Sequence, residues 1–202
     1  MMVTSQAIVA LASRCAAAAR SMESDLNLAD SRLGDGDTGT MLARLLTAVE
    51  ATAACGNLGE TFRAMAKAAS GSTGSSLGTL VSAALLAMGR SCGDRASLPL
   101  TDLSILLKTA RDEMLSLGRS ELGDKTIIDG LDAIAISVEA CTRPDEIASA
   151  AMSAAQDAIQ EFRGRPCRVG RARLWPERSM ELDDPGMLAL AAIVQAVGTK
   201  DS

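Results

Sequence analysis

The sequence predicts an all-α protein folded as one domain. Apolar residues make up 48% of the 202 residues, and they are mostly Ala, Leu, Ile, Val and Met, with two Phe, one Trp and no Tyr. Because Ala and Leu are the best helix formers, this composition favours helices. Apolar residues also recur at helical spacing along the whole chain, while the alternating pattern of strands is missing.

Eight segments have this helical spacing. Asn57, Thr73 and Asp124 can cap helix starts, and Pro144 and Pro185 suit a first helical position. Glycine is common where helices stop. The expected stops are Gly56, Gly89, Gly118, Gly164 and Gly198. The expected helices cover residues 5–24, 40–54, 58–69, 74–90, 100–117, 124–141, 144–162 and 186–198.

The chain shows no division into parts. It contains no internal repeat, no low-complexity tail and no linker rich in Pro, Gly or Ser. Its length suits one domain that buries most of its apolar surface. We therefore expect residues 1–202 to form a single domain.

Charge and composition exclude several classes of partner. A formal net charge of −5 and few aromatic residues argue against nucleic acid. The first six residues lack the positive charge of a secretory signal, and no stretch is apolar for long enough to span a bilayer. The five cysteines are scattered singly, as free thiols are in a reducing compartment. We expect a cytoplasmic protein without a membrane partner.

The chain contains no histidine. This absence excludes a Ser-His-Asp triad, a His-ligated zinc and a phosphohistidine intermediate on this polypeptide. Its chemistry must therefore rest on carboxylates, hydroxyls, backbone amides and cations.

The long connection from Ala29 to Gly39 is rich in Asp and Gly. It places Asp30, Asp35 and Asp37 where a loop can bring them to one point. Two carboxylates about 4 Å apart repel by about 4 kcal/mol at a protein surface, so convergence favours a bound cation. Mg²⁺ prefers oxygen ligands and shares its shell between carboxylates and phosphates. A solvated acidic turn explains the local sequence equally well.

Familiar nucleotide and calcium motifs do not account for this loop. Gly34, Gly36 and Gly39 spell G-x-G-x-x-G, but no strand precedes them and no Lys-Ser or Lys-Thr completes a P-loop. Calcium-loop spacing fails because Thr40 stands at the sixth position from Asp35, where that loop needs Gly.

The stretch from Ser70 to Gly78 is rich in Gly and Ser and leads into a helical pattern. It therefore lies at a helix N-terminus, where free amides and the helix dipole attract anions. Close packing of helices through small residues is the alternative.

Two further segments could face the same ligand. Gly123 to Thr126 opens a predicted helix, where a cap at Asp124 is the simpler interpretation. The second long connection, residues 164–184, contains Arg171, and an arginine there could neutralise phosphate charge, although surface arginines are more often solvated.

Together, in order and spacing, these segments resemble the nucleotide-binding L subunit of bacterial dihydroxyacetone kinase over nearly the whole chain. The resemblance implies a barrel of eight antiparallel helices with the nucleotide at one end, which agrees with the helix count. It also makes the acidic-turn alternative less favoured. The matching segments are Leu33–Gly39, Gly71–Thr79, Gly123–Thr126 with Asp129, Gly170–Ala172, Glu177–Ser179 and Asp184–Gly186.

The resemblance also implies cofactors and residue roles. Asp30, Asp35 and Asp37 would hold two Mg²⁺ against the phosphates of ADP or ATP. Asp35, Asp37 and Arg171 would act directly on the transferring phosphoryl group. The implied nucleotide-binding residues are Thr38, Gly39, Thr40, Met41, Ser72, Thr73, Gly118, Ile127, Arg171, Asp184, Pro185 and Gly186.

In the family a separate K subunit or domain holds the ketone covalently through a histidine. Because this chain has no histidine, the resemblance implies a K-type partner that carries a small ketose, either dihydroxyacetone or erythrulose. The phosphoryl donor is ATP or a phosphotransferase protein that recharges bound ADP, and a homodimer is also compatible with the sequence.

Departures from the family pattern keep other functions open. Thr38 stands where the family commonly has histidine, and Leu174 and Trp175 lie in a segment that differs. A non-catalytic Mg-nucleotide module that docks on a regulator is therefore the main alternative. A fatty-acid-kinase-like function is less favoured, because those proteins join this domain to further ones.

Overall fold

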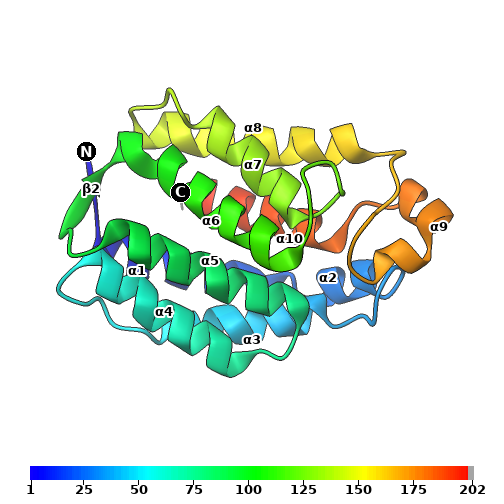
Figure 1. Cartoon of the computed structure of the whole chain (residues 1–202), viewed down its shortest axis with the longest axis horizontal. Helices are drawn as coiled ribbons and strands as arrows, with labels where there is room; N and C mark the ends of the chain where they lie inside the picture. Colours follow the sequence, from blue (N-terminus) through cyan, green and yellow to red (C-terminus); the bar gives the residue numbers. More distant parts are fainter. Residues whose placement is uncertain (200–202) are drawn as a thin grey trace.

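The computed structural model describes residues 1–199, in which the eight longer helices form a closed barrel (Figure 1). Two short helices, α2 and α9, and two short strands accompany them. The elements are β1 (Met2–Thr4), α1 (Ser5–Ser21), α2 (Glu23–Asp30), α3 (Thr38–Glu50), α4 (Leu58–Ser72), α5 (Ser76–Cys92), β2 (Ser97–Pro99), η1 (Leu100–Asp102), α6 (Leu103–Gly118), α7 (Ile127–Ser137), α8 (Pro144–Phe162), η2 (Ala172–Leu174), α9 (Pro176–Glu181) and α10 (Pro185–Gly198).

Each longer helix packs against the next one along the chain, and α10 packs back against α1, which closes the ring. The connections therefore alternate between the two ends of the barrel. Four of them gather at one end, on the right in Figure 1: α2 to α3, α4 to α5, α6 to α7 and α8 to α10. The predicted all-α barrel is confirmed.

The apolar faces of the helices fill the interior of the barrel. Leu45 and Leu58 are completely buried, and Met65 is 1% exposed. Small residues let neighbouring helices approach closely. A Cβ on Gly39 would overlap the carbonyl oxygen of Glu23, so this glycine allows the start of α3 to lie against α2. That contact sets the position of the acidic loop between the two helices.

Several predicted helix boundaries are confirmed. Asn57 caps α4 by accepting a hydrogen bond from the Glu60 amide at 2.8 Å. Pro144 and Pro185 are the first residues of α8 and α10. Gly118 is the last residue of α6.

Two predicted caps are wrong. Ser75, not Thr73, caps α5, and its hydroxyl accepts from the Gly78 amide at 3.0 Å. Thr126, not Asp124, caps α7. Its hydroxyl accepts a hydrogen bond from the Ile128 amide, and the Asp129 carboxylate accepts one from the Thr126 amide. In both places several Ser, Thr or Asp residues stand close together, and the tertiary fold selects among them.

Other boundaries also differ from the prediction. The helix expected over residues 5–24 breaks at Met22 and resumes as α2, although no strong helix breaker marks this place. Gly89 lies inside α5, which ends before Gly93 at φ +56°. Gly56 follows α3 by several residues. The predicted helices 40–54 and 124–141 are shorter at their C-terminal ends, as α3 and α7.

Short elements that the apolar pattern did not predict complete the fold. Strands β1 and β2 pair antiparallel, with Val3 opposite Leu98, and three residues each are too few to show an alternating pattern. The second long connection contains η2 and α9. In the described part of the chain, no helix is long and apolar enough to cross a membrane.

Candidate metal and nucleotide site

The acidic loop is folded around Asp30, the last residue of α2. Its Oδ2 accepts hydrogen bonds from the backbone amides of Gly36 at 2.9 Å, Asp37 at 3.0 Å and Thr38 at 3.3 Å. Gly36 has φ +78°, a conformation that glycine adopts without strain. A Cβ on Gly34 would overlap Asp30 Oδ1. The glycines therefore let the loop wrap closely around one buried carboxylate.

This fold brings the three predicted carboxylates together. One oxygen each of Asp30, Asp35 and Asp37 lies within 4.8 Å of the other two. Asp30 is buried, whereas Asp35 and Asp37 are exposed. Lost hydration, followed by the nearby carboxylates of Asp35 and Asp30, raises the pKa of Asp37. The loop concentrates negative charge at one point, and a cation would relieve the repulsion.

The donor set fits a hard divalent cation. All three groups offer carboxylate oxygens, the ligand type that Mg²⁺ prefers. Because two of them face solvent, they leave coordination positions for water or phosphate oxygens. The residues present therefore fit Mg²⁺, and their role as its ligands stays a prediction.

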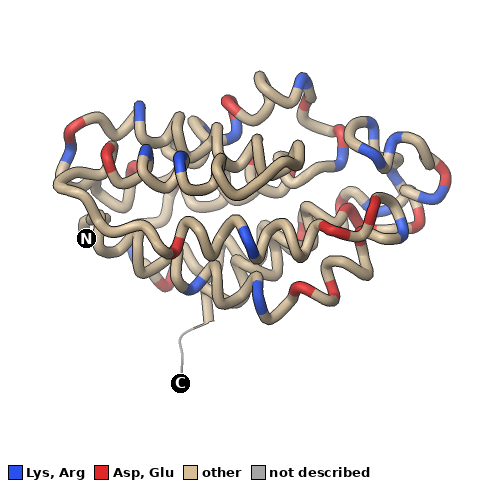
Figure 2. Tube along the Cα trace, turned by 90° about the horizontal axis from the view of Figure 1, so that it is seen from below, with Lys and Arg blue, Asp and Glu red and all other residues tan. Residues whose placement is uncertain are grey.

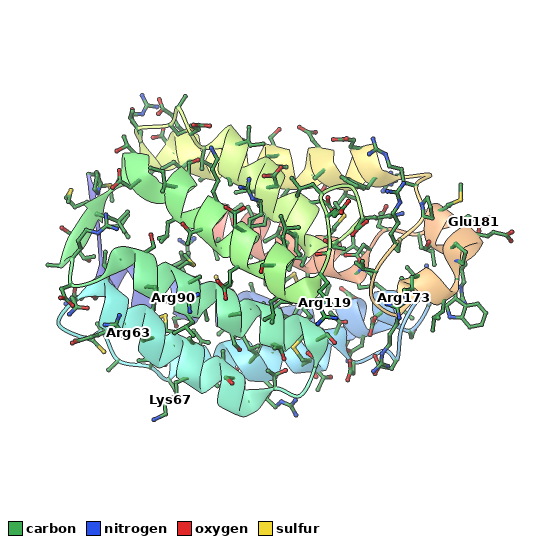
Figure 3. All side chains as sticks on the ribbon, viewed as in Figure 1. Arg63, Lys67, Arg90, Arg119, Arg173 and Glu181 are labelled. Carbon is green, nitrogen blue, oxygen red and sulfur yellow. The ribbon has the colours of Figure 1, made fainter. Side chains whose placement is uncertain are left out.

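A cationic side chain reaches the cluster from a distant part of the sequence. Arg171, in the connection between α8 and α9, forms an ion pair with Asp35. Of the other basic residues in this connection, Arg173 lies at the same end of the barrel in Figure 3. Figure 2 shows acidic and basic residues side by side at this end. The structure thus places a predicted phosphate-binding arginine beside a predicted metal ligand.

The Gly/Ser turn between α4 and α5 lies at the same end of the barrel. The Thr73 side chain packs so closely over Gly78 that a Cβ there would overlap it. Added Cβ atoms at Gly71 and Gly74 would meet nothing within 4 Å, so the backbone is open on that side. The first amides of α5 have no acceptor within the helix, as in anion sites at helix N-termini.

Two of the predicted residues at the start of α3 are held by contacts within the protein, although Thr40 itself is exposed. The Thr40 hydroxyl donates to Glu23 at 2.7 Å and accepts from Asn27 at 2.9 Å. Met41 is 4% exposed and belongs to the core. The Thr40 amide also donates to Asn27 Oδ1 at 3.0 Å, and the Met41 amide donates to the Asp37 carbonyl at 2.8 Å. The hydroxyl of Thr40, the side chain of Met41 and both backbone amides are thus engaged within the protein.

The remaining predicted residues form a second group at the starts of α7 and α10. A Cβ on Gly186 would lie 3.2 Å from Ile127 Cβ, so the two helix starts touch. Asp184 caps α10 through the Met187 amide at 2.9 Å. Burial raises the pKa of Asp184 to about 6, although hydrogen bonds from the Met187 and Gly186 amides, and then the charge of Lys125, oppose the rise.

Gly118 lies at the end of α6, where an added Cβ would be 3.5 Å from Leu80 on α5. Gly118 therefore lies between the Gly/Ser turn and the predicted residues at the starts of α7 and α10. All of the predicted site residues lie at one end of the barrel or in the turns of helices that reach it.

Sequence reasoning missed one residue that organises this end. Lys125 is 1% exposed, and its amino group bonds three carbonyl oxygens of the second long connection. A lysine in a short polar segment gives no sign in the sequence that it is buried.

The protein is a closed barrel of antiparallel helices, and one end of it carries a carboxylate cluster that suits a metal ion and an open helix N-terminus that suits an anion. A family model, the DAK2 domain, matches residues 32–199. The chain belongs to this family, and its barrel is a domain of the type found in the L subunit of dihydroxyacetone kinase.

Curated relatives are kinases. The chain is 30% identical to D-erythrulose kinase of Mycolicibacterium smegmatis over 185 residues, which are 87% of this chain and 32% of the relative. It is 28% identical to L-erythrulose kinase of Pectobacterium atrosepticum, over 92% of this chain and 34% of the relative. The chain therefore spans about a third of the length of these enzymes.

A third relative is the ADP-binding subunit DhaL of the PEP-dependent dihydroxyacetone kinase of Escherichia coli. It is 34% identical over 111 residues, which are 48% of this chain and 53% of DhaL. This match covers a shorter stretch than the matches to the erythrulose kinases.

Solved structures show the same fold. The native dihydroxyacetone kinase of C. freundii superposes with a TM-score of 0.75 at 24% identity, over 95% of this chain and 34% of that chain. The same kinase in complex with AMP-PNP and Mg²⁺ gives a TM-score of 0.75 at 25% identity, over 94% of this chain and 33% of that chain.

Proposed function

We propose that this chain is the Mg-nucleotide-binding part of a ketose kinase. In this proposal it forms a single domain over residues 1–202, works in the cytoplasm and binds ADP or ATP with two Mg²⁺. It transfers a phosphoryl group to a small ketose held by a K-type partner. The observation that carries the proposal is the convergence of Asp30, Asp35 and Asp37 beside Arg171.

The relatives support the choice of ligand and reaction. Two relatives are erythrulose kinases, and the third is the ADP-binding subunit of a dihydroxyacetone kinase. The C. freundii kinase has been solved with AMP-PNP and Mg²⁺. Oxygen-only donors that face solvent on one side suit a metal shared with a nucleotide's phosphates.

Each residue of the proposed site has a distinct task. Bound Mg²⁺ would neutralise phosphate charge and fix the phosphates in line for transfer. Asp30 holds the loop rigid through its three backbone hydrogen bonds, which leaves Asp35 and Asp37 to present their oxygens. Arg171 lies where it can turn from Asp35 to a phosphate oxygen. The open turn from Ser72 to Ser75 lets phosphates approach backbone amides.

The ketose requires a partner. This chain has no histidine to hold a ketone, and it spans about a third of the erythrulose kinases that it matches. We therefore propose that a K-type subunit or domain brings dihydroxyacetone or erythrulose to the barrel end that bears the cluster. The donor is ATP, or a phosphotransferase protein acting on bound ADP.

The direct test of the site is calorimetric titration with ADP. In the presence of Mg²⁺ we expect saturable binding, and excess EDTA should abolish it. ADP binding that is absent, or that is unchanged by EDTA, would contradict the proposed site.

The partner dependence needs a separate experiment. The purified chain, mixed with ATP, Mg²⁺ and dihydroxyacetone or erythrulose, should form no phosphorylated ketose, and adding a K-type protein from a related kinase should start turnover. Robust turnover by the chain alone would refute the need for a partner. Co-purification with neighbouring proteins from the cell would then identify the donor and the ketose.

A regulatory module that binds Mg-nucleotide without catalysis remains the second candidate. It is favoured by Thr38, which replaces a histidine common in the family, and by the changed segment around Trp175. Binding of Mg-ADP with no turnover for any ketose, donor or K-type partner would support this alternative.

A further inference from the structure

Lys125 is the most unusual buried side chain of the protein's described part. It is 1% exposed, yet its Nζ donates hydrogen bonds to the carbonyl oxygens of Arg165 at 3.0 Å, Ser179 at 2.7 Å and Leu182 at 2.8 Å. An ammonium group has three donors, so every one is used. No ion pair among residues 1–199 includes Lys125.

This arrangement is costly in two ways. Burying an ammonium group is unfavourable unless hydrogen bonds replace its hydration. Lys125 also has φ +62°, a left-handed conformation that costs a residue with a side chain about 1 kcal/mol or more. Neither cost is needed to complete the barrel, because α7 begins after Lys125 with its own cap at Thr126. A role in the adjoining connection explains both.

The three carbonyl groups lie at the two ends of that connection. Arg165 follows α8, and Ser179 and Leu182 belong to or follow α9, shortly before α10 begins. One ammonium group therefore holds the start and the end of the loop together. Because bringing loop ends together costs conformational entropy, such a clamp keeps the loop closed before any ligand arrives.

Other contacts also join the start and the end of this loop. The Gly164 amide donates to the Met180 carbonyl at 3.1 Å, and Arg163 pairs with Asp183 at 3.0 Å. The Cys167 amide also donates to Ser179 Oγ at 2.9 Å. These bonds join the same two ends of the loop as Lys125 but are exposed or neutral, so the buried ammonium is the one charged group that ties the ends together from inside the protein.

The loop clamped in this way carries Arg171 to the acidic cluster. Arg171 lies between the carbonyls of Arg165 and Ser179 in sequence, and its guanidinium pairs with Asp35. The side chain of Arg171 is 66% exposed, so contacts around the side chain itself do little to hold it in place. The position of its backbone decides where the guanidinium can reach. The closed base of the loop sets this position together with Ala172, which is buried in a cluster with Leu33 of the acidic loop.

We propose that Lys125 is a positioning residue that closes the loop of residues 163–184 and thereby holds Arg171 over the metal and phosphate site. Through Leu182, two residues before the α10 cap Asp184, the same ammonium ties the start of α10 into this unit. The role of Arg171 in nucleotide binding rests on the function proposed above, whereas the closing of the loop does not.

Hydrogen–deuterium exchange tests the closing of the loop without any ligand. Lys125→Met keeps the length of the side chain and removes its three donors. We expect the amides of residues 163–184 to exchange at least about tenfold faster in this variant, while those of α4 and α5 keep their protection. Lys67→Met is the matched control, because Lys67 is exposed and points away from the barrel in Figure 3. Unchanged loop exchange in Lys125→Met would overturn the proposal.

A double-mutant cycle tests the link to Arg171. We expect Lys125→Met and Arg171→Ala each to weaken Mg-ADP affinity about tenfold, and the double variant to be no weaker than Arg171→Ala alone. A purely structural role would instead add a second loss. Additive losses would therefore overturn the positioning role. If wild-type protein fails to bind Mg-ADP, the proposed function is wrong. The exchange experiment still tests whether Lys125 closes the loop.

Lys125→Arg covers the case in which the Met variant does not fold. Arginine keeps the charge, but its planar, wider group cannot direct three donors to the same three carbonyls. We expect an intact barrel with partial loss of loop protection and an intermediate Mg-ADP affinity. Full loop protection together with wild-type affinity in this variant would contradict the proposal.

Discussion

The acidic loop (residues 30–38) and the Arg171 loop (residues 163–184) face the same site, but buried charges of opposite sign hold their backbones. The acidic loop is short, and the buried carboxylate of Asp30 holds it through backbone amides. The Arg171 loop is long, and the buried ammonium of Lys125 holds it through backbone carbonyls. In each loop a buried charge organises the backbone, while exposed groups of the same sign, Asp35 and Asp37 or Arg171, remain available for a ligand.

The buried charges thus build the site, and the exposed charges are expected to bind the ligand. If this distinction is correct, exposed charges should affect ligand affinity without changing stability, and buried charges should affect stability or loop order as well. Substitutions at each kind of position can therefore confirm or break it.

The largest effect is expected at an exposed acidic position. Asp35→Asn removes a predicted metal ligand but no buried hydrogen bond, so Mg-ADP affinity should fall at least about 100-fold while the helical fold is retained. Calorimetry measures the first effect, and circular dichroism with urea unfolding the second. Glu181→Gln, which removes an exposed carboxylate on α9 (Figure 3), is the control. Unchanged Mg-ADP affinity in Asp35→Asn would count against the site.

The buried acid of the same loop should behave differently. Asp30→Asn leaves one acceptor oxygen but removes the charge that three amides share. Charge-assisted bonds are the strong ones, so we expect the free energy of unfolding to fall by about 1–3 kcal/mol, in addition to weaker Mg-ADP binding. Urea unfolding without Mg²⁺ isolates the structural part. Equal stability of Asp30→Asn and Asp35→Asn would break the distinction between building and binding.

The end of the Arg171 loop offers a test through pH. Burial raises the pKa of Asp184 to about 6, from an ordinary value near 3.8. The folded protein therefore binds more protons than the unfolded chain between about pH 4 and pH 6, and this group lowers stability as pH rises through that window. Asp184→Asn keeps a good helix cap and removes the charge.

We expect Asp184→Asn to be more stable than wild type at pH 7, by on the order of 1–2 kcal/mol, and the difference to vanish near pH 4. Urea unfolding of both proteins at pH 4, 5, 6 and 7 measures it, and other carboxylates cancel in the comparison. A stability difference that does not change with pH would show that burial of the Asp184 charge does not destabilise the folded protein.

The two loops also differ in how far the sequence predicted them. The convergence of the three aspartates was predicted, because residues 30–38 fold on themselves through local bonds to Asp30. The eight longer helices were also predicted, apart from some of their ends, since their apolar spacing is local. The roles of these aspartates as metal ligands stay predictions.

The sequence predicted Arg171 as a phosphate-binding residue but not the structure of its loop, because that structure depends on distant contacts. Lys125 bonds residues 40, 54 and 57 positions away, and no local pattern reports such a contact. The same limit explains the wrong caps. Local sequence offers Thr73 and Ser75 as equivalent, and only the packing of Thr73 over Gly78 leaves Ser75 as the cap of α5.

The smallest effect is expected at Thr38, which both helps to build the site and is expected to bind the ligand. Its backbone amide helps build the loop by donating to Asp30, whereas its hydroxyl is left to donate to a phosphate oxygen. Thr38→Val keeps the amide and the shape but loses the hydroxyl. One neutral hydrogen bond contributes about 0.5–1.5 kcal/mol, so Mg-ADP affinity should fall about three- to tenfold with stability unchanged. A loss as large as that of Asp35→Asn would mean that the hydroxyl touches the metal itself, and no loss would leave Thr38 with the structural task alone.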